Sequence, residues 1–195
     1  VYGLITSAFF GAYAGLVVFG LYVLGLIMAV ISGLILKNTA FRGDTAAFVL
    51  ELPPYRVPTL KNTALHVWER VKDFLIKAGT ILLIMSIILW VLQNFTFSFR
   101  MTDNMADSIL AKIGTFIAPA FRPQGFGFWQ AAVALLTGLI AKESVVTSLS
   151  MFYGFSITAS GAAVSAAMTG FTPLSAFSFL VFILLYVPCV AAVST

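Results

Sequence analysis

The first 36 residues contain no charged side chain, and this feature limits the fold of the chain more than any other. A helix that crosses the hydrocarbon layer of a membrane needs only about 20 apolar residues. The stretch therefore predicts the tail of one helix, Val1–Phe10, followed by a complete membrane span at Ala12–Leu36. No cationic segment precedes this span, which argues against a signal peptide.

The composition of the whole chain points the same way. Of its 195 residues, 61% are hydrophobic and only 9% are charged, against about 25% charged residues in soluble domains. So few charges cannot cover a water-facing surface. The net charge of +4 comes from a few basic residues beside apolar segments, so it is not a signal of nucleic-acid binding. The single cysteine, Cys189, excludes an internal disulfide. We expect an all-α fold, a polytopic transmembrane helix bundle with at least three spans.

Both ends of the chain are apolar, and neither has the polar flank expected of a terminus. Val1 is not an initiator methionine, and Leu174–Thr195 is apolar to its last residues. We therefore expect the chain to be a piece of a larger transporter-like protein.

The strongly polar region at 37–77 orients the first two spans. Loops rich in lysine and arginine stay on the cytoplasmic side of a membrane. This region holds seven of the eleven basic residues: Lys37, Arg42, Arg56, Lys61, Arg70, Lys72 and Lys77. Within it, Pro53, Pro54 and Pro58 predict an extended elbow. An amphipathic interfacial helix follows, capped by Asn62 or Thr63, and His66 on it is expected to be an interfacial residue.

Further helices follow in the second half of the chain. Ala78–Leu92 predicts the second span, and the connection 93–127 is expected to lie outside the cytoplasm, with a short helix at Ala106–Ile117. A third span is predicted at Phe128–Met151, and aromatic residues at its start indicate the outer interface.

The segment 153–170 is uncharged and rich in small residues. It is compatible with a loop, a packing helix or a broken, re-entrant helix. Thr172 and Pro173 suit the N-cap and first turn of the last span.

The segment Gly138-Leu-Ile-Ala-Lys142-Glu143-Ser144-Val-Val is the first candidate site. A charged side chain deep in a membrane costs about 2.5–3.5 kcal/mol, which favours a functional role. At about 100° per residue, Glu143, Ser144 and Thr147 share one helix face, with Ser150 close beside it. This polar face requires a partner on another helix, a water-filled path or a cation. The alternative is that Lys142 and Glu143 only hold neighbouring helices together.

The segment Tyr186-Val-Pro188-Cys189 is the second candidate site. Pro188 frees a helix carbonyl in an apolar segment, and transporters often bind cations at such broken helices. A thiolate at Cys189 would favour a transition metal over sodium. The alternative is a simple kink beside a buried, inert cysteine. Phosphate-loop, zinc-protease and serine-hydrolase motifs are missing from the sequence, so no self-contained enzyme is predicted.

These motifs, taken in order, resemble a known family. Five segments carry the resemblance: Glu51-Leu-Pro-Pro-Tyr-Arg-Val-Pro58, His66-Val-Trp-Glu-Arg-Val-Lys72, Phe74-Leu-Ile-Lys-Ala-Gly-Thr80, Gly138-Leu-Ile-Ala-Lys-Glu-Ser-Val-Val146 and Leu184-Leu-Tyr-Val-Pro-Cys189. Together they resemble the C-terminal membrane region of the ferrous iron transport protein B (FeoB) family of bacteria and archaea, over nearly the whole chain.

The resemblance implies a multi-pass protein of the prokaryotic cytoplasmic (inner) membrane that imports Fe²⁺. It implies two related gate repeats, with the end of the first repeat and one span at 1–36, the cytoplasmic elbow and amphipathic helix at 37–77, and most of the second repeat at 78–195. GTP and Mg²⁺ would bind only an N-terminal G domain that this sequence lacks. The implied partners are lipid, the remaining helices and G domain, a small accessory protein and a second copy of the chain.

The resemblance also implies roles for particular residues. Gly138, Lys142 and Glu143 would belong to the second gate, and Cys189 would be the intramembrane thiol. The family often has threonine shortly after that cysteine, whereas Ala191 and Ala192 follow here, which argues against a hydroxyl ligand at that point.

The leading hypothesis is an Fe²⁺ permease region whose ion path is lined by Cys189, Glu143, Ser144 and Thr147, because Fe²⁺ accepts mixed sulfur and oxygen ligands. Two alternatives remain at this stage. One is a nucleoside permease with a larger, aromatic-lined cavity. The other is a membrane anchor or assembly scaffold.

Overall fold

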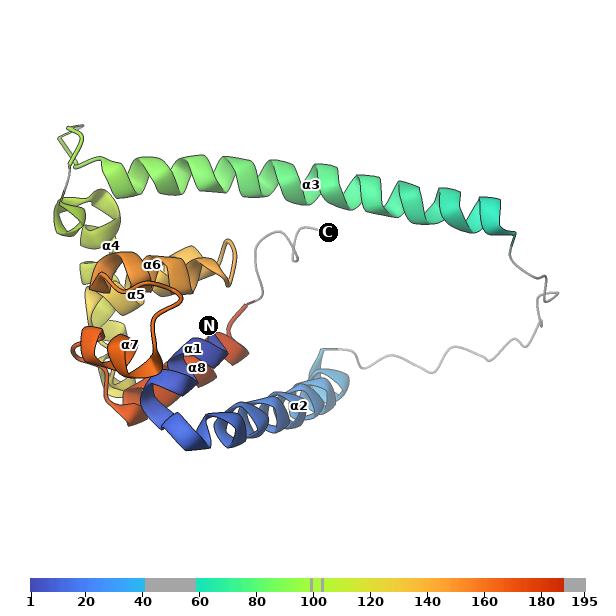
Figure 1. Cartoon of the computed structure of the whole chain (residues 1–195). Helices are drawn as coiled ribbons and strands as arrows, with labels where there is room; N and C mark the ends of the chain where they lie inside the picture. Colours follow the sequence, from blue (N-terminus) through green and yellow to red (C-terminus); the bar gives the residue numbers. More distant parts are fainter. Residues whose placement is uncertain (41–58, 99, 103, 188–195) are drawn as a thin grey trace.

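The computed structural model describes residues 1–40, 59–98, 100–102 and 104–187, with backbone only at 77 and 78. Within these ranges the chain consists of α-helices and short 3₁₀ helices, and it has no β-strand beyond one isolated bridge between Phe95 and Met101. The predicted all-α fold is confirmed. Figure 1 shows α1 and α4–α8 gathered into a bundle, with the long helices α2 and α3 extending away from it.

The N-terminal apolar stretch forms two helices, as predicted. Helix α1 spans Tyr2–Phe10 and α2 spans Ala14–Thr39, with one 3₁₀ turn, η1 (Gly11–Tyr13), between them. Gly11 has a φ of 49°, a left-handed conformation that glycine adopts without a steric penalty. Of the residues in α2, Leu21 is buried, so almost the whole apolar surface of this helix faces outward.

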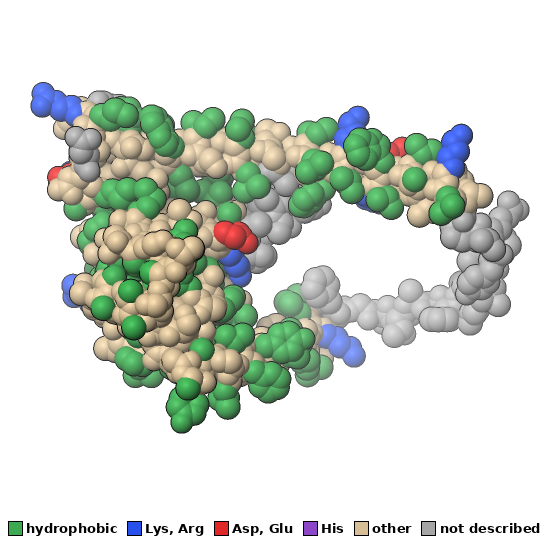
Figure 2. Space-filling view, in the orientation of Figure 1, with side chains coloured by type: hydrophobic (Ala, Val, Ile, Leu, Met, Phe, Trp, Pro, Cys, Tyr) green, Lys and Arg blue, Asp and Glu red, His purple; other side chains and the backbone are tan. Residues whose placement is uncertain are grey.

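Helix α3 spans Leu60–Asn94 without a break. The amphipathic segment and the predicted second span are therefore one continuous helix. Its N-cap is Thr59 rather than the expected Asn62 or Thr63. Figure 2 shows charged side chains over the half of α3 that begins at Leu60, and mainly hydrophobic ones over the other half.

Two described segments are long and apolar enough to cross a membrane. They are Tyr2–Thr39 and Leu60–Asn94, whose 18-residue apolar windows have mean hydropathies of 2.6 and 2.4. The helices of the second half are shorter, so the described residues supply two helices of spanning length where the sequence predicted at least three spans.

Short helices connect α3 to the bundle. They are η2 (Met105–Asp107), α4 (Ile109–Ile117) and η3 (Ala118–Gln124). The predicted helix at Ala106–Ile117 thus begins at Ile109, because the Ser108 hydroxyl accepts a hydrogen bond from the Ala111 N–H and caps α4.

The prediction of a continuous third span at Phe128–Met151 is wrong. Helix α5 ends at Gly138 (Trp129–Gly138) and α6 begins at Ser144 (Ser144–Tyr153), with the two helices packed against each other. Glycine is a weak helix former, and Lys142 at this break bonds to another helix instead of extending along the span. The chain therefore folds back where the sequence carries its charged pair.

The small-residue segment after α6 contains a short helix, α7 (Gly161–Ala167), which lies against α1. Helix α8 follows at Pro173–Leu185. The predicted start of α8 is confirmed, because the Thr172 hydroxyl accepts from the Ser175 N–H at 3.2 Å and the Thr172 N–H donates to Ser175 Oγ at 2.8 Å. This reciprocal pair is a capping box.

The core lies between α1, α5, α6, α7 and α8, and its centre is aromatic. Phe126 and Phe179 are fully buried, with their ring centroids 5.3 Å apart and nearly perpendicular, a favourable edge-to-face arrangement. Phe126 therefore packs in the core of the bundle.

Candidate functional site

The turn between α5 and α6 brings the charged pair to one place in the bundle. The turn is closed by backbone hydrogen bonds from Ile140 N to Thr137 O, 3.1 Å, and from Ser144 N to Ala141 O, 2.9 Å. Lys142 and Glu143 stand next to each other at its end. Because the turn is compact, the two side chains leave it in different directions.

The Lys142 side chain reaches the C-terminal end of α8. The last hydrogen bond of that helix runs from the Tyr186 N–H to Phe182 O, at 2.9 Å. The next carbonyl, Ile183 O, accepts a hydrogen bond from Lys142 Nζ at 3.0 Å. The same Nζ lies 5.1 Å from the centroid of the Tyr186 ring. A cation is favourable at this position, both at the negative end of a helix and over an aromatic face.

Gly138 makes room for this contact. A Cβ atom at this position would lie 2.4 Å from Tyr186 Oη and 2.5 Å from Val145 Cγ2. The Tyr186 hydroxyl is buried and has no hydrogen-bond partner among the described residues. The glycine of the motif is thus explained by the close approach of the tyrosine to the end of α5.

The Glu143 side chain is exposed and has other neighbours. It lines an open hollow of about 410 Å³ together with Thr147, Val146 and residues of α1 and of the chain before α7. The Glu143 carboxylate makes no hydrogen bond or ion pair to another side chain in the described parts of the chain. The structure therefore brings Glu143 and Thr147 together, whereas Ser144 does not line this hollow.

A buried polar contact that the sequence did not reveal ties α5 to α6. Thr137 Oγ1 and Ser148 Oγ are 2.9 Å apart, and Thr137 also donates to Ala134 O. Both side chains are almost fully buried. Thr137 lies five positions before Lys142, and Ser148 lies five positions after Glu143. In a helical hairpin whose turn is centred on the charged pair, these two positions face each other, so this symmetry was the signal that could have predicted their contact.

The second candidate segment is only partly described. Pro188 and Cys189 lie outside the described residues, so their predicted roles stay predictions. Helix α8 ends at Leu185, and Tyr186 is already extended, with a ψ of 166°. No group of three or more histidine, cysteine, aspartate or glutamate side chains that could hold a metal occurs in the parts of the chain that the structure describes.

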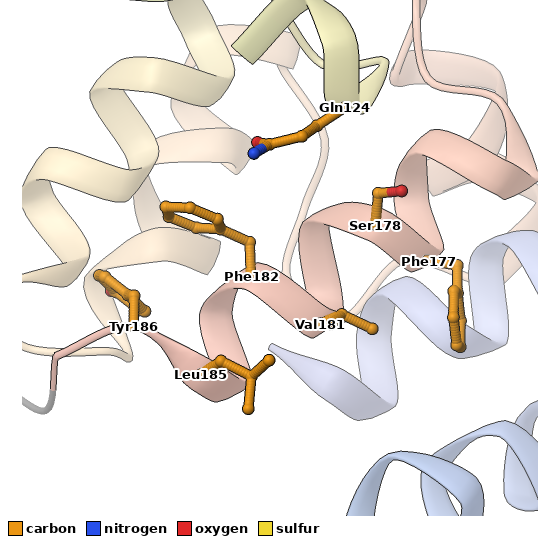
Figure 3. Close-up of a pocket in the computed structure, with 7 residues that line it drawn as sticks. All are labelled: Gln124, Phe177, Ser178, Val181, Phe182, Leu185 and Tyr186. Atoms are coloured by element: carbon orange, nitrogen blue, oxygen red, sulfur yellow. The ribbon is translucent and has the colours of Figure 1, made fainter. Parts of the chain in front are cut away.

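A second hollow runs along the outer side of α8. Its volume is about 470 Å³, and Figure 3 shows the side chains that line it: Gln124, Phe177, Ser178, Val181, Phe182, Leu185 and Tyr186. Three of these residues are aromatic, and the Gln124 amide from η3 is directed toward the same space. Tyr186 thus borders this hollow and also receives the Lys142 ammonium on its ring.

Comparison with known proteins gives two family matches. The model described as the ferrous iron transport protein B C terminus matches residues 18–70. The gate model, described as nucleoside recognition, matches residues 75–195, which is more than half of the chain. Fold and matches together define a helical membrane region of the gate type. The chain belongs to the ferrous iron transport protein B family and corresponds to part of its C-terminal membrane region.

Curated relatives agree with this assignment. The Fe(2+) transporter FeoB of Staphylococcus aureus (strain COL) is 40% identical over 194 residues, which cover 100% of this chain and 29% of that protein. The Fe(2+) transporter FeoB of Salmonella typhimurium (strain LT2) is 44% identical over 155 residues, or 78% of this chain and 20% of that protein. The chain thus spans less than a third of the length of these relatives. No solved structure matches it.

Proposed function

We propose that this chain is the membrane-embedded part of a ferrous iron importer. The observation that carries the proposal is the identity of 40% over the whole chain with a protein named as an Fe(2+) transporter. The long apolar helices suit a region embedded in lipid. The chain itself is proposed to carry no enzymatic activity, and GTP with Mg²⁺ would bind a separate G domain of the longer protein.

The ion path is proposed to use Cys189, Glu143, Ser144 and Thr147. Glu143 and Thr147 support it most directly, because they share one hollow and the carboxylate makes no bond to another described side chain that would hold it. Oxygen ligands from this pair and a thiolate from Cys189 are donors that Fe²⁺ accepts. Pro188, the first residue beyond the described part of the chain, would keep α8 from continuing.

The proposed setting is the cytoplasmic (inner) membrane of a prokaryote, where the full protein crosses the bilayer several times. Seven basic residues at 37–77 support a cytoplasmic position for that region. The proposed partners are the remaining helices and G domain of the same protein, a small accessory protein and a second copy of the chain.

Replacing Cys189 by serine in the full-length protein tests the proposal. We expect anaerobic Fe²⁺ uptake into proteoliposomes to fall at least about tenfold, because a hydroxyl is a poorer ligand for Fe²⁺ than a thiolate. Uptake is measured per folded molecule, with Ser178→Ala on the outer side of α8 as the matched control. Unchanged uptake would remove the thiol from the ion path, and no Fe²⁺ uptake by the wild type would contradict the proposed function.

Nucleoside transport is a second candidate, favoured by two observations. The gate match carries the description nucleoside recognition, and the hollow beside α8 has the aromatic lining that a nucleobase would stack on. A membrane scaffold has no such observation in its favour.

The same proteoliposomes separate the two candidates. If the chain transports nucleosides, radiolabelled nucleoside should enter, and Phe182→Ala should reduce entry while Cys189→Ser should not. If it transports iron, we expect no nucleoside accumulation above that of empty liposomes.

A further inference from the structure

We propose that Lys142 is a positioning residue, which locks the end of α8 onto the α5–α6 turn and thereby fixes the place of Glu143. Only the expected effect of Lys142 on ion flux rests on the proposed iron transport. The lock itself is a property of the bundle and can be measured without iron.

A lysine that carries its proton is not an ion ligand. An ammonium group has three donors and no acceptor, so it cannot coordinate Fe²⁺ and would repel it. In this structure two acceptors of α8 already engage it, the Ile183 carbonyl at 3.0 Å and the Tyr186 ring at 5.1 Å. Lys142 therefore acts through the elements that it joins.

The lock joins segments far apart in the sequence. Lys142 and Ile183 are separated by 41 residues, and each contact involves the last turn of α8. The hydrogen bond has a charged donor, and such bonds are stronger in surroundings of low dielectric constant. Gly138 completes the fit, since any larger residue would collide with the Tyr186 hydroxyl.

The lock has a direct consequence for the neighbouring carboxylate. Glu143 follows Lys142 in the same turn and lines the hollow on the other side, with Thr147. Glu143 makes no bond of its own to another described side chain, so the backbone of the turn sets which space its side chain can reach. Release of Lys142 from α8 would free this backbone and displace the proposed ion ligand.

A double-mutant cycle in the full-length protein tests the lock. Lys142→Met, Tyr186→Leu and the double variant are compared by thermal unfolding in detergent. We expect the second substitution to cost less after the first, because both remove the contact between the Lys142 ammonium and the Tyr186 ring. Lys112→Met is the matched control, since its ammonium lies 5.5 Å from the ring of another aromatic residue, Phe97. Additive effects of Lys142→Met and Tyr186→Leu would overturn the proposal.

Fe²⁺ uptake per folded molecule then tests the positioning role. We expect Lys142→Met to lower uptake at least about tenfold, the scale of a lost charge-assisted hydrogen bond. Lys142→Arg should restore most of it, because a guanidinium can both donate to the carbonyl and stack on the ring. Normal uptake by a folded Lys142→Met protein would overturn the positioning role and leave iron transport standing. Absence of uptake by the wild type would instead overturn the proposed function, while the unfolding cycle still decides the lock.

Discussion

Replacing Gly161 by alanine is expected to lower the free energy of unfolding by about 1–3 kcal/mol or more, the usual cost of overpacking a tight contact. The new Cβ atom would lie 2.4 Å from Ser7 O, 2.8 Å from Ser7 C and 3.1 Å from Ala8 N. All three are backbone atoms of α1, so no side chain can rotate away to relieve the collision. Helix α7 would have to move off α1, which opens the bundle beside the Glu143 hollow.

The measurement for Gly161 is the fraction of full-length protein that stays monodisperse after heating in detergent. Gly3→Ala is the matched control, because Gly3 lies on the same helix as Ser7 and a Cβ there would meet nothing within 4 Å. Equal heat resistance of the two variants would show that α1 and α7 can separate at no cost.

Replacing Gly138 by alanine is expected to destabilise the protein by a similar amount, about 1–3 kcal/mol, and to reduce transport as well. The added Cβ would collide with Tyr186 Oη at 2.4 Å and Val145 Cγ2 at 2.5 Å. Tyr186 would be pushed out, and the Lys142 contact at the end of α8 would be lost with it. Thermal unfolding and Fe²⁺ uptake are measured on the same preparation.

A second substitution makes this prediction specific. Tyr186→Phe removes the hydroxyl that the new methyl group meets, and this hydroxyl has no partner among the described residues to lose. We expect Gly138→Ala with Tyr186→Phe to regain part of the stability, whereas Gly20→Ala, in an open position of α2, should be harmless from the start. A double variant no more stable than Gly138→Ala alone would place the strain at Val145 instead.

The parts of the fold that depend on local sequence could be predicted. The uncharged N-terminal stretch and its division near Gly11 were apparent from composition and length, and the start of α8 from the Thr172–Pro173 pair. Each of these signals lies within one element. The continuity of α3 could not be predicted in the same way, because its polar and apolar halves satisfy two different patterns.

The break between α5 and α6 could not be predicted, because its cause lies elsewhere in the chain. The partner of Lys142 is a main-chain carbonyl 41 residues later, and nothing in the sequence around Lys142 points to that partner. Without the break, the helical periodicity placed Ser144 beside Glu143 and Thr147. The buried Ser148, which bonds to Thr137, was passed over for the same reason.

The sequence also could not tell whether an aromatic residue faces lipid or the protein core. Phe126 precedes an apolar helix, which is typical of a membrane interface, yet it is fully buried against Phe179. Composition places phenylalanine in an apolar setting but does not distinguish lipid from protein as its neighbour. Tertiary contacts decide between the two.

The uninterrupted length of α3 gives the protein a mechanical property. Its 35 residues correspond to a rod of about 52 Å, held by the described bundle at the end where α4 packs against it. A tilt of about 10° at that end would swing the Leu60 end through about 9 Å. A small rotation where α4 packs against the helix would therefore displace its basic end by several ångströms.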